Sequence, residues 1–136
     1  MDPGETIVEA ALRETHEEVG VTLPESSVLG LLDDYPTRSG YVITPVVIWG
    51  GGRLDLRPAP DEVVAAYRVG LHQLQRPDSP RFVSIPESDR PVVQIPLGGD
   101  LIHAPTGAVL LQLRLLGLEG RPDPVHDLEQ PVFAWR

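Results

Sequence analysis

Residues 5 to 21 have the sequence ETIVEAALRETHEEVGV, and their pattern predicts the first helix of the chain. Its apolar positions repeat at the helical period of about 100° per residue, and they are Val8, Leu12, Thr15 and Val19. Thr6 is suited to cap the N-terminus, with Glu9 as its capping-box partner, and Gly20 is suited to end the helix. We therefore predict a helix over residues 6–19.

The same helix would carry three acidic residues, Glu14, Glu17 and Glu18, on one face, because they stand at positions i, i+3 and i+4. Like charges at this spacing repel each other by roughly 0.2–0.5 kcal/mol per pair. A hard divalent cation would offset that repulsion, since carboxylate oxygens are its preferred ligands. Three glutamates alone are also compatible with an ordinary solvated helix face.

Composition limits the remaining possibilities. The 136 residues suit one domain, and 41% hydrophobic with 23% charged residues is typical of a soluble globular protein. A net charge of −9 argues against nucleic acid or an anionic membrane as the main partner. Cysteine is absent, which excludes disulfides and thiolate sites. No apolar run approaches the roughly 20 residues of a membrane span, and the first residues do not resemble a signal peptide, so we expect a cytoplasmic protein.

Beyond the first helix, the sequence predicts several strands and a second helix. Strands are expected at residues 28–32, 41–49, 53–57, 62–69, 81–85 and 92–97. Pro45 would mark an edge or a bulge, and Gly50–Gly52 would form a hairpin turn. A helical turn is expected at residues 71–75 and a buried helix at 106–118, capped by Thr106. This order of elements predicts a single domain of mixed α/β or α+β class.

Written as a pattern, residues 5–21 are E-x7-R-E-T-x-E-E-x-G-V, which closely resembles the Nudix box, G-x5-E-x7-R-E-U-x-E-E-x-G-U, where U is a bulky aliphatic residue. Thr15 stands where an aliphatic residue is usual, although its methyl group can still pack. The opening glycine of the box would precede Met1, so the chain begins inside the motif. The resemblance implies an α/β/α sandwich with a mixed sheet, here expected to lack its first strands.

The resemblance extends to the coenzyme A pyrophosphatase branch of the Nudix hydrolases. The similar segments are residues 29–34, 37–41, 44–47, 61–63 and 102–107, although His103 replaces an expected tryptophan. The resemblance implies Mg²⁺- or Mn²⁺-dependent hydrolysis of the diphosphate in a nucleoside diphosphate derivative, with coenzyme A or a derivative as the expected substrate. ADP-ribose or a dinucleotide is the alternative substrate.

The same resemblance implies roles for individual residues. Glu14, Glu17 and Glu18 would coordinate the metal, and Glu14 or another of the three would orient or deprotonate the attacking water. Arg13 would pair with Glu5 and hold a glutamate in position, while Gly20 would support the site. Further candidates are Glu62 as an additional acid, and Thr37, Arg38 and Tyr41 as substrate-binding residues. An exposed acid at Glu62 and a merely ordered loop at 37–41 are the alternatives.

Two other kinds of protein stay open on the sequence alone. One is a weakly active or inactive Nudix-like binding module, since the chain lacks the start of the box. The other is an acidic interaction module that uses the helix face to bind a partner. An incomplete sheet would expose an unpaired strand edge, and this favours a homodimer.

Overall fold

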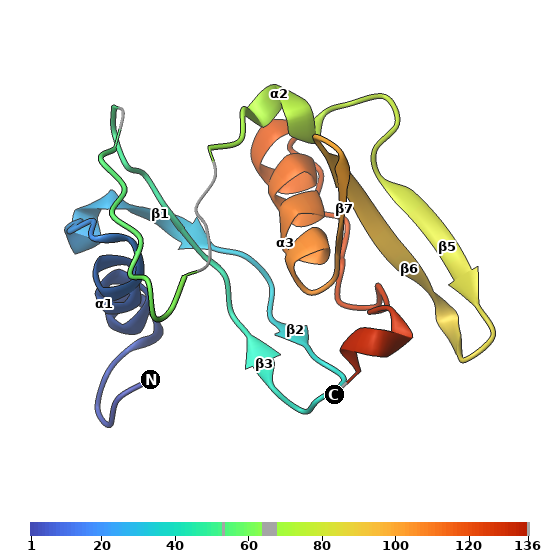
Figure 1. Ribbon diagram of the computed structural model, residues 1–136, viewed down its shortest axis with the longest axis horizontal. Coiled ribbons are helices and arrows are strands. Elements are labelled where there is room, and N and C mark those ends of the chain that lie inside the picture. Colours follow the sequence, from blue (N-terminus) through green and yellow to red (C-terminus); the bar gives the residue numbers. More distant parts are fainter. Residues whose placement is uncertain (53, 64–67, 136) are drawn as a thin grey trace. The chain divides into compact units, whose positions relative to one another are not determined.

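A computed structural model describes residues 1–52, 54–63 and 68–135, and the chain divides into two compact units. The first unit comprises Met1–Leu31 and Val46–Arg68, and the second comprises Leu32–Pro45 and Val69–Arg136. Helices and antiparallel strand pairs occur together (Figure 1), which confirms the mixed α/β class. The single-domain organisation stays a prediction.

The first unit is built on helix α1, Ile7–Val19, whose ends agree with the prediction. The Thr6 hydroxyl accepts a hydrogen bond from the Glu9 N–H (3.1 Å), and the Thr6 N–H donates to the Glu9 carboxylate (3.5 Å), so the capping box is present. Gly20 ends the helix with a φ of 72°, a left-handed conformation that favours glycine. Local sequence signals therefore set both ends of α1.

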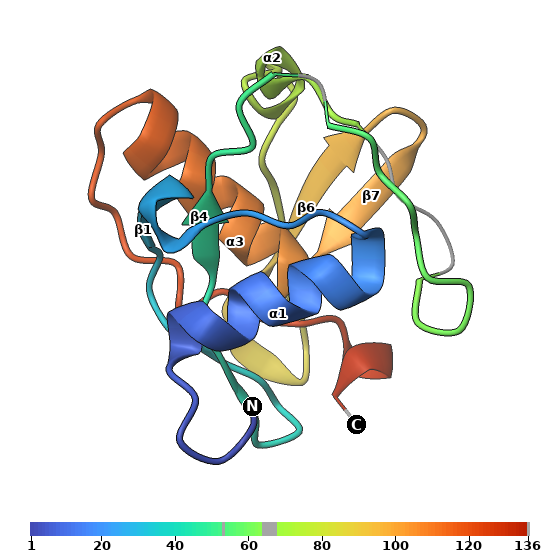
Figure 2. The same cartoon turned by 90° about the vertical axis from the view of Figure 1, so that its left-hand side faces the viewer.

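A two-stranded antiparallel sheet completes the regular structure of the first unit. A short 3-10 helix, Glu25–Ser27, leads into β1, Val28–Leu31, which pairs with β4, Val46–Ile48. Helix α1 contacts β4, and Figure 2 shows the helix running across this strand pair. The strand predicted at residues 28–32 is confirmed.

The segment after β4 differs from the prediction. The N–H groups of Arg57 and Ala59 donate to the carbonyls of Val19 and Glu18, both at 2.7 Å. This segment therefore caps the C-terminus of α1, and the strand predicted at 53–57 is wrong for the described residues 54–57. Of the strand predicted at 62–69, residues 64–67 lie outside the described part of the chain, and residues 62–63 and 68–69 are not in a strand.

The second unit begins with a hairpin of β2, Tyr35–Pro36, and β3, Val42–Ile43. The strand predicted at residues 41–49 is therefore two strands, since β3 pairs with β2 whereas β4 pairs with β1. Pro45 lies at the break, in agreement with the edge or bulge expected there. Proline lacks the N–H that a continuous ladder needs at each paired position.

The main sheet of the second unit has the strand order β5-β6-β7, from Arg81–Ile85, Ser88–Leu97 and Asp100–His103, all antiparallel. Helix α2 is Leu71–Leu74, and α3, Thr106–Gln112, packs on β6 and β7 (Figure 1). A side chain at Gly107 would meet the Ile102 carbonyl at 2.6 Å, so glycine permits this close approach. The core cluster consists of Tyr35, Val93, Ile95, Ala104, Ala108, Leu111, Val125 and Leu128.

Several boundaries in the second unit correct the sequence predictions. Strand β6 begins at Ser88 rather than Val92, and β7 was not predicted. Thr106 is the first helical residue rather than the cap, which is Pro105. The chain continues as a π-helix, Leu113–Leu118, and a 3-10 turn, Val132–Ala134, lies near the C-terminus. Within the described ranges, no helix is long and apolar enough to cross a membrane.

Candidate metal and substrate site

The three glutamates predicted to bind metal lie on exposed positions of α1. The side chains of Glu14 and Glu17 are 53% and 48% exposed, and Glu18 is also exposed. Beneath this face, Ala10 is buried, and the Thr15 hydroxyl donates to the Ala11 carbonyl at 2.7 Å. That bond satisfies the polar group of Thr15, so the residue fits a half-buried position where an aliphatic side chain is usual.

Arg13 and Glu5 form a two-pronged ion pair beside the acidic face. The Arg13 Nε and Nη2 atoms donate to the two carboxylate oxygens of Glu5 at 2.8 and 3.0 Å. These hydrogen bonds lower the pKa of Glu5 to about 2 and raise the pKa of Arg13. The Arg13 Nη1 atom also donates to Glu17 at 3.0 Å, and Glu14 lies within 3.8 Å of the guanidinium. The sequence-predicted pairing of Arg13 with Glu5 is thus present.

The donor set has the right chemistry for a hard cation. All three side chains offer carboxylate oxygens, which Mg²⁺ and Mn²⁺ prefer. In the described part of the chain, however, no three acidic or histidine side chains converge closely enough to hold a metal ion. Glu17 is directed to Arg13 instead. Metal binding at this face would therefore require glutamate side chains to change rotamer, which exposed side chains do readily.

Gly20 lets the segment after β4 approach the C-terminal end of α1. A Cβ atom at Gly20 would lie 3.0 Å from the Cβ of Arg57, so the close contact between α1 and this segment depends on glycine. The segment turns directly afterwards, where the Glu62 N–H donates to the Ala59 carbonyl at 3.1 Å. The Glu62 turn thus follows the residues that cap α1, and the role of Glu62 as an additional acid stays a prediction.

The loop predicted to contact substrate is an ordered hairpin loop in the second unit. The Thr37 N–H donates to the Tyr41 carbonyl at 2.7 Å, and the Thr37 hydroxyl accepts from the Tyr41 N–H at 3.0 Å. Gly40 supplies a φ of 95°, which a tight loop requires. Tyr41 is 74% exposed and therefore accessible to a ligand.

Arg38, the third residue predicted to bind substrate, forms an ion pair that the sequence analysis missed. Its Nε and Nη2 atoms donate to the two oxygens of Glu129 at 3.0 and 2.6 Å, and its guanidinium lies 4.0 Å from the ring centre of Trp135. The Glu129 side chain is 1% exposed and also accepts hydrogen bonds from Arg90 and Ser88. Arg38 holds the pKa of Glu129 at about 2. No local pattern could have identified this pair, because 91 positions separate its members.

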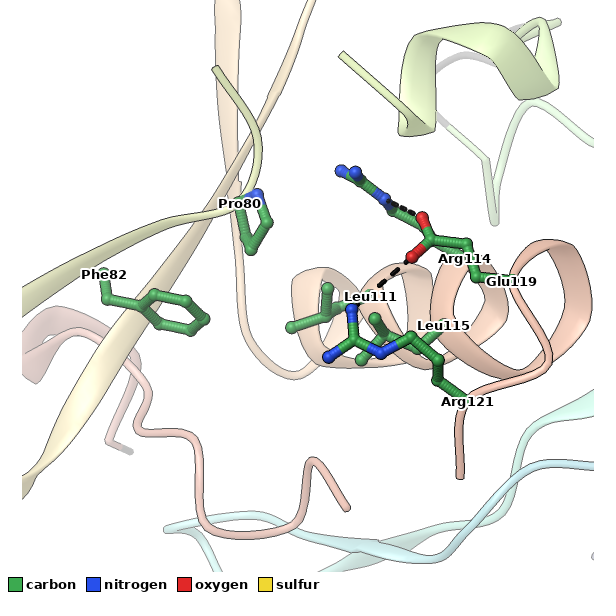
Figure 3. Close-up of a pocket in the computed structure, with 7 residues that line it drawn as sticks. All are labelled: Pro80, Phe82, Leu111, Arg114, Leu115, Glu119 and Arg121. Atoms are coloured by element: carbon green, nitrogen blue, oxygen red, sulfur yellow. Dashed lines mark hydrogen bonds and ion pairs between the residues drawn. The ribbon is translucent and has the colours of Figure 1, made fainter. Parts of the chain in front are cut away.

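A hollow of about 180 Å³ lies elsewhere in the second unit (Figure 3). Its lining combines apolar and charged side chains, and consists of Pro80, Phe82, Leu111, Arg114, Leu115, Glu119 and Arg121. Arg114 donates to Glu119 at 2.7 Å and to the carbonyls of Leu74 and Ser79. Arg121 pairs with Glu119 and Asp123 at 3.5 and 3.1 Å, so the charged side chains of this lining are paired within the protein.

In a mixed α/β fold, the capped helix α1 thus presents an acidic face, and its Arg13 pairs with Glu5 just before the helix. A model of the NUDIX domain matches residues 1–86, and the chain belongs to this family. Its relatives include the uncharacterized Nudix hydrolase NudL of Escherichia coli O1:K1 / APEC and that of Shigella boydii serotype 18 (strain CDC 3083-94 / BS512). Each is 36% identical over 72 residues, which cover 53% of this chain and 38% of the relative. The match thus spans about two fifths of these relatives.

Proposed function

We propose that this chain is a metal-dependent pyrophosphohydrolase that cleaves the diphosphate of a nucleoside diphosphate derivative. The observation that carries the proposal is the geometry of α1. Its caps and the Arg13–Glu5 pair fix a helix on which Glu14, Glu17 and Glu18 share one exposed face. Membership of the NUDIX family supports the same reaction class.

In this proposal, Mg²⁺ or Mn²⁺ would be held by Glu14, Glu17 and Glu18. A bound divalent cation would neutralise the diphosphate oxygens and make water a better nucleophile. Glu14 is proposed to orient or deprotonate the attacking water, and Arg13 is proposed to hold the acidic side chains in position through its ion pairs with Glu5 and Glu17. Glu62 is proposed as the additional acid.

The proposed substrate is coenzyme A or a derivative, bound in part by Thr37, Arg38 and Tyr41. The support is the resemblance of residues 29–34, 37–41 and 44–47 to the coenzyme A pyrophosphatase branch. The net charge of −9 favours a small anionic substrate that arrives with its metal ion over a nucleic acid. ADP-ribose and dinucleotides are the competing substrates, and a homodimer is the proposed assembly.

The test is release of phosphate-containing products from coenzyme A, ADP-ribose and a dinucleotide, with and without Mg²⁺ or Mn²⁺. We expect metal-dependent cleavage that Glu18→Gln reduces by about 100-fold or more, because a lost ligand removes transition-state charge stabilisation. Glu87→Gln is the matched control, since Glu87 is an exposed acid in the β5–β6 turn of the second unit. Turnover that Glu18→Gln leaves unchanged would contradict the assigned mechanism.

A binding module without turnover is the second candidate function. In the described ranges Glu17 is paired with Arg13, and no three acidic or histidine side chains lie close enough together to hold a metal ion. Calorimetric titration with Mg²⁺ and Mn²⁺ separates the two functions. Metal binding that depends on Glu18, without cleavage of any of the three substrates, would support the binding module. Metal-dependent cleavage would exclude it.

A further inference from the structure

One buried carboxylate, Glu129, connects three parts of the second unit that are distant in sequence. These are the 37–41 loop, the start of β6 and the C-terminal segment 129–135. The Arg38 guanidinium donates hydrogen bonds to both carboxylate oxygens of Glu129, and Arg90 and Ser88 donate to its Oε2 atom at 2.8 and 2.7 Å. Ionised, two-pronged pairs are directional as well as strong, so this contact fixes both the position and the orientation of Arg38.

The C-terminal segment also holds Arg38 through two further contacts. The Arg38 N–H donates to the side-chain oxygen of Gln130 at 2.8 Å, and the guanidinium stacks over Trp135. The Trp135 indole N–H in turn donates to the Gln130 carbonyl at 2.8 Å. Backbone and side chain of Arg38 are therefore both fixed by residues more than 90 positions away in the chain.

The same loop stays accessible although it is fixed at Arg38. The Arg38 side chain is 36% exposed and Tyr41 is 74% exposed, so neither is enclosed by the protein. A loop that is ordered before binding loses less conformational entropy when a ligand docks. Fixed geometry combined with exposed side chains is what a pre-organised binding loop needs.

We infer that Glu129 is a positioning residue for substrate, which holds Arg38 and the 37–41 loop in the conformation that binds the nucleoside diphosphate derivative. This inference rests on the proposed function, because it concerns the substrate of that site. It assigns Glu129 no contact with the reacting atoms. Replacing Glu129 should therefore change substrate affinity, whereas replacing the α1 glutamates should change the rate of the chemical step.

The test measures binding of coenzyme A and of ADP-ribose by calorimetry, which does not require turnover. Glu129→Gln should weaken binding by about tenfold or more, since the Arg38 fork loses its charged partner. It should also speed amide hydrogen exchange at Thr37, Gly40 and Tyr41, whose N–H groups are bonded within the loop. Leu111→Ala is the control for general loss of stability, because Leu111 is buried in the same unit and should leave affinity unchanged.

Arg38→Lys is the second variant, in case Glu129→Gln prevents folding. It keeps the charge but removes the fork, and the same loss of affinity is expected. Unchanged affinity in a folded Glu129→Gln or Arg38→Lys protein overturns the inference, as does a wild-type protein that binds neither probe. Glu129-dependent binding without hydrolysis would overturn the proposed reaction and keep this inference. Hydrolysis combined with binding that does not depend on Glu129 would keep the proposed reaction and overturn this inference.

Discussion

Replacing Gly20 by alanine tests how the end of α1 is joined to the segment that follows β4. Gly20 has a φ of 72°, and a Cβ there would lie 3.0 Å from the Cβ and 3.3 Å from the carbonyl oxygen of Arg57. Both neighbouring atoms are close to the backbone, so they cannot move aside by a side-chain rotation. The substitution therefore has two separate costs.

The first cost is conformational and the second is steric. A left-handed conformation costs a non-glycine residue roughly 1–2 kcal/mol. Carbon atoms normally approach to about 3.5–4.0 Å, so the contact with Arg57 is too short, and overpacking of this kind costs about 1–3 kcal/mol. Gly20→Ala should thus lose about 2–5 kcal/mol. Gly98→Ala should lose only the first cost, because Gly98 has a φ of 58° and no atom within 4 Å of the added Cβ.

Urea unfolding, followed by both circular dichroism and tryptophan fluorescence, measures the difference. Coincident transitions are needed before a free energy of unfolding is assigned to either variant. We expect Gly20→Ala to be the less stable of the two by about 1–3 kcal/mol, which is the steric cost. Equal losses in both variants would refute the close contact with Arg57. No loss in either variant would refute the conformational cost as well.

Three further predictions concern single interactions. Thr6→Ala should destabilise α1 by about 1 kcal/mol, visible as reduced helicity and stability, because the N-cap bond is lost. The pKa of Glu5 is lowered from 4.5 to about 2, so its ion pair with Arg13 stabilises the fold fully above pH 4.5. This stabilisation is lost as the pH falls toward 2, because Glu5 becomes protonated. Glu5→Gln should therefore weaken the pH dependence of the free energy of unfolding between pH 4.5 and 2. Arg114→Met should cost about 1–3 kcal/mol in thermal unfolding, since two carbonyls lose their donor, whereas the exposed Arg121→Met should be near neutral.

Local sequence signals predicted the first helix and failed where pairing is set by distant residues. The two caps of α1 could be derived from local residue types and spacing, whereas the Arg13–Glu5 pair, whose members are eight positions apart, was implied by the family resemblance. Strand β7 and the start of β6 could not be derived in this way, because Ser88–Pro91 and Asp100 are polar or lack strand preference. They become strands through the antiparallel pairing of the β5-β6-β7 sheet.

Among the proposed functional residues, too, those set by local spacing could be predicted, whereas contacts between distant residues could not. The acidic residues of α1 were predicted as a group, because helical spacing alone places them on one face. Arg38 was predicted as a substrate-binding residue of the 37–41 loop, but its ion pair with Glu129 was not predicted. A buried carboxylate near the C-terminus has no local signature, since its partners are 39 to 91 positions away.

Because of this difference in range, the proposed metal-binding face of the first unit and the proposed substrate loop of the second unit should respond differently to perturbation. The acidic face depends on contacts within the first unit, which are the capping box, the Arg13–Glu5 pair and the segment that caps the C-terminus of α1. The position of Arg38 in the 37–41 loop depends on contacts that exist only when the C-terminal segment of the second unit is packed in place. Mild denaturant or loss of residues 129–135 should therefore abolish the proposed substrate binding, while helix α1 and the metal binding proposed for it persist. Parallel loss of both would mean that one cooperative unit, rather than two separable sets of contacts, supports the proposed site.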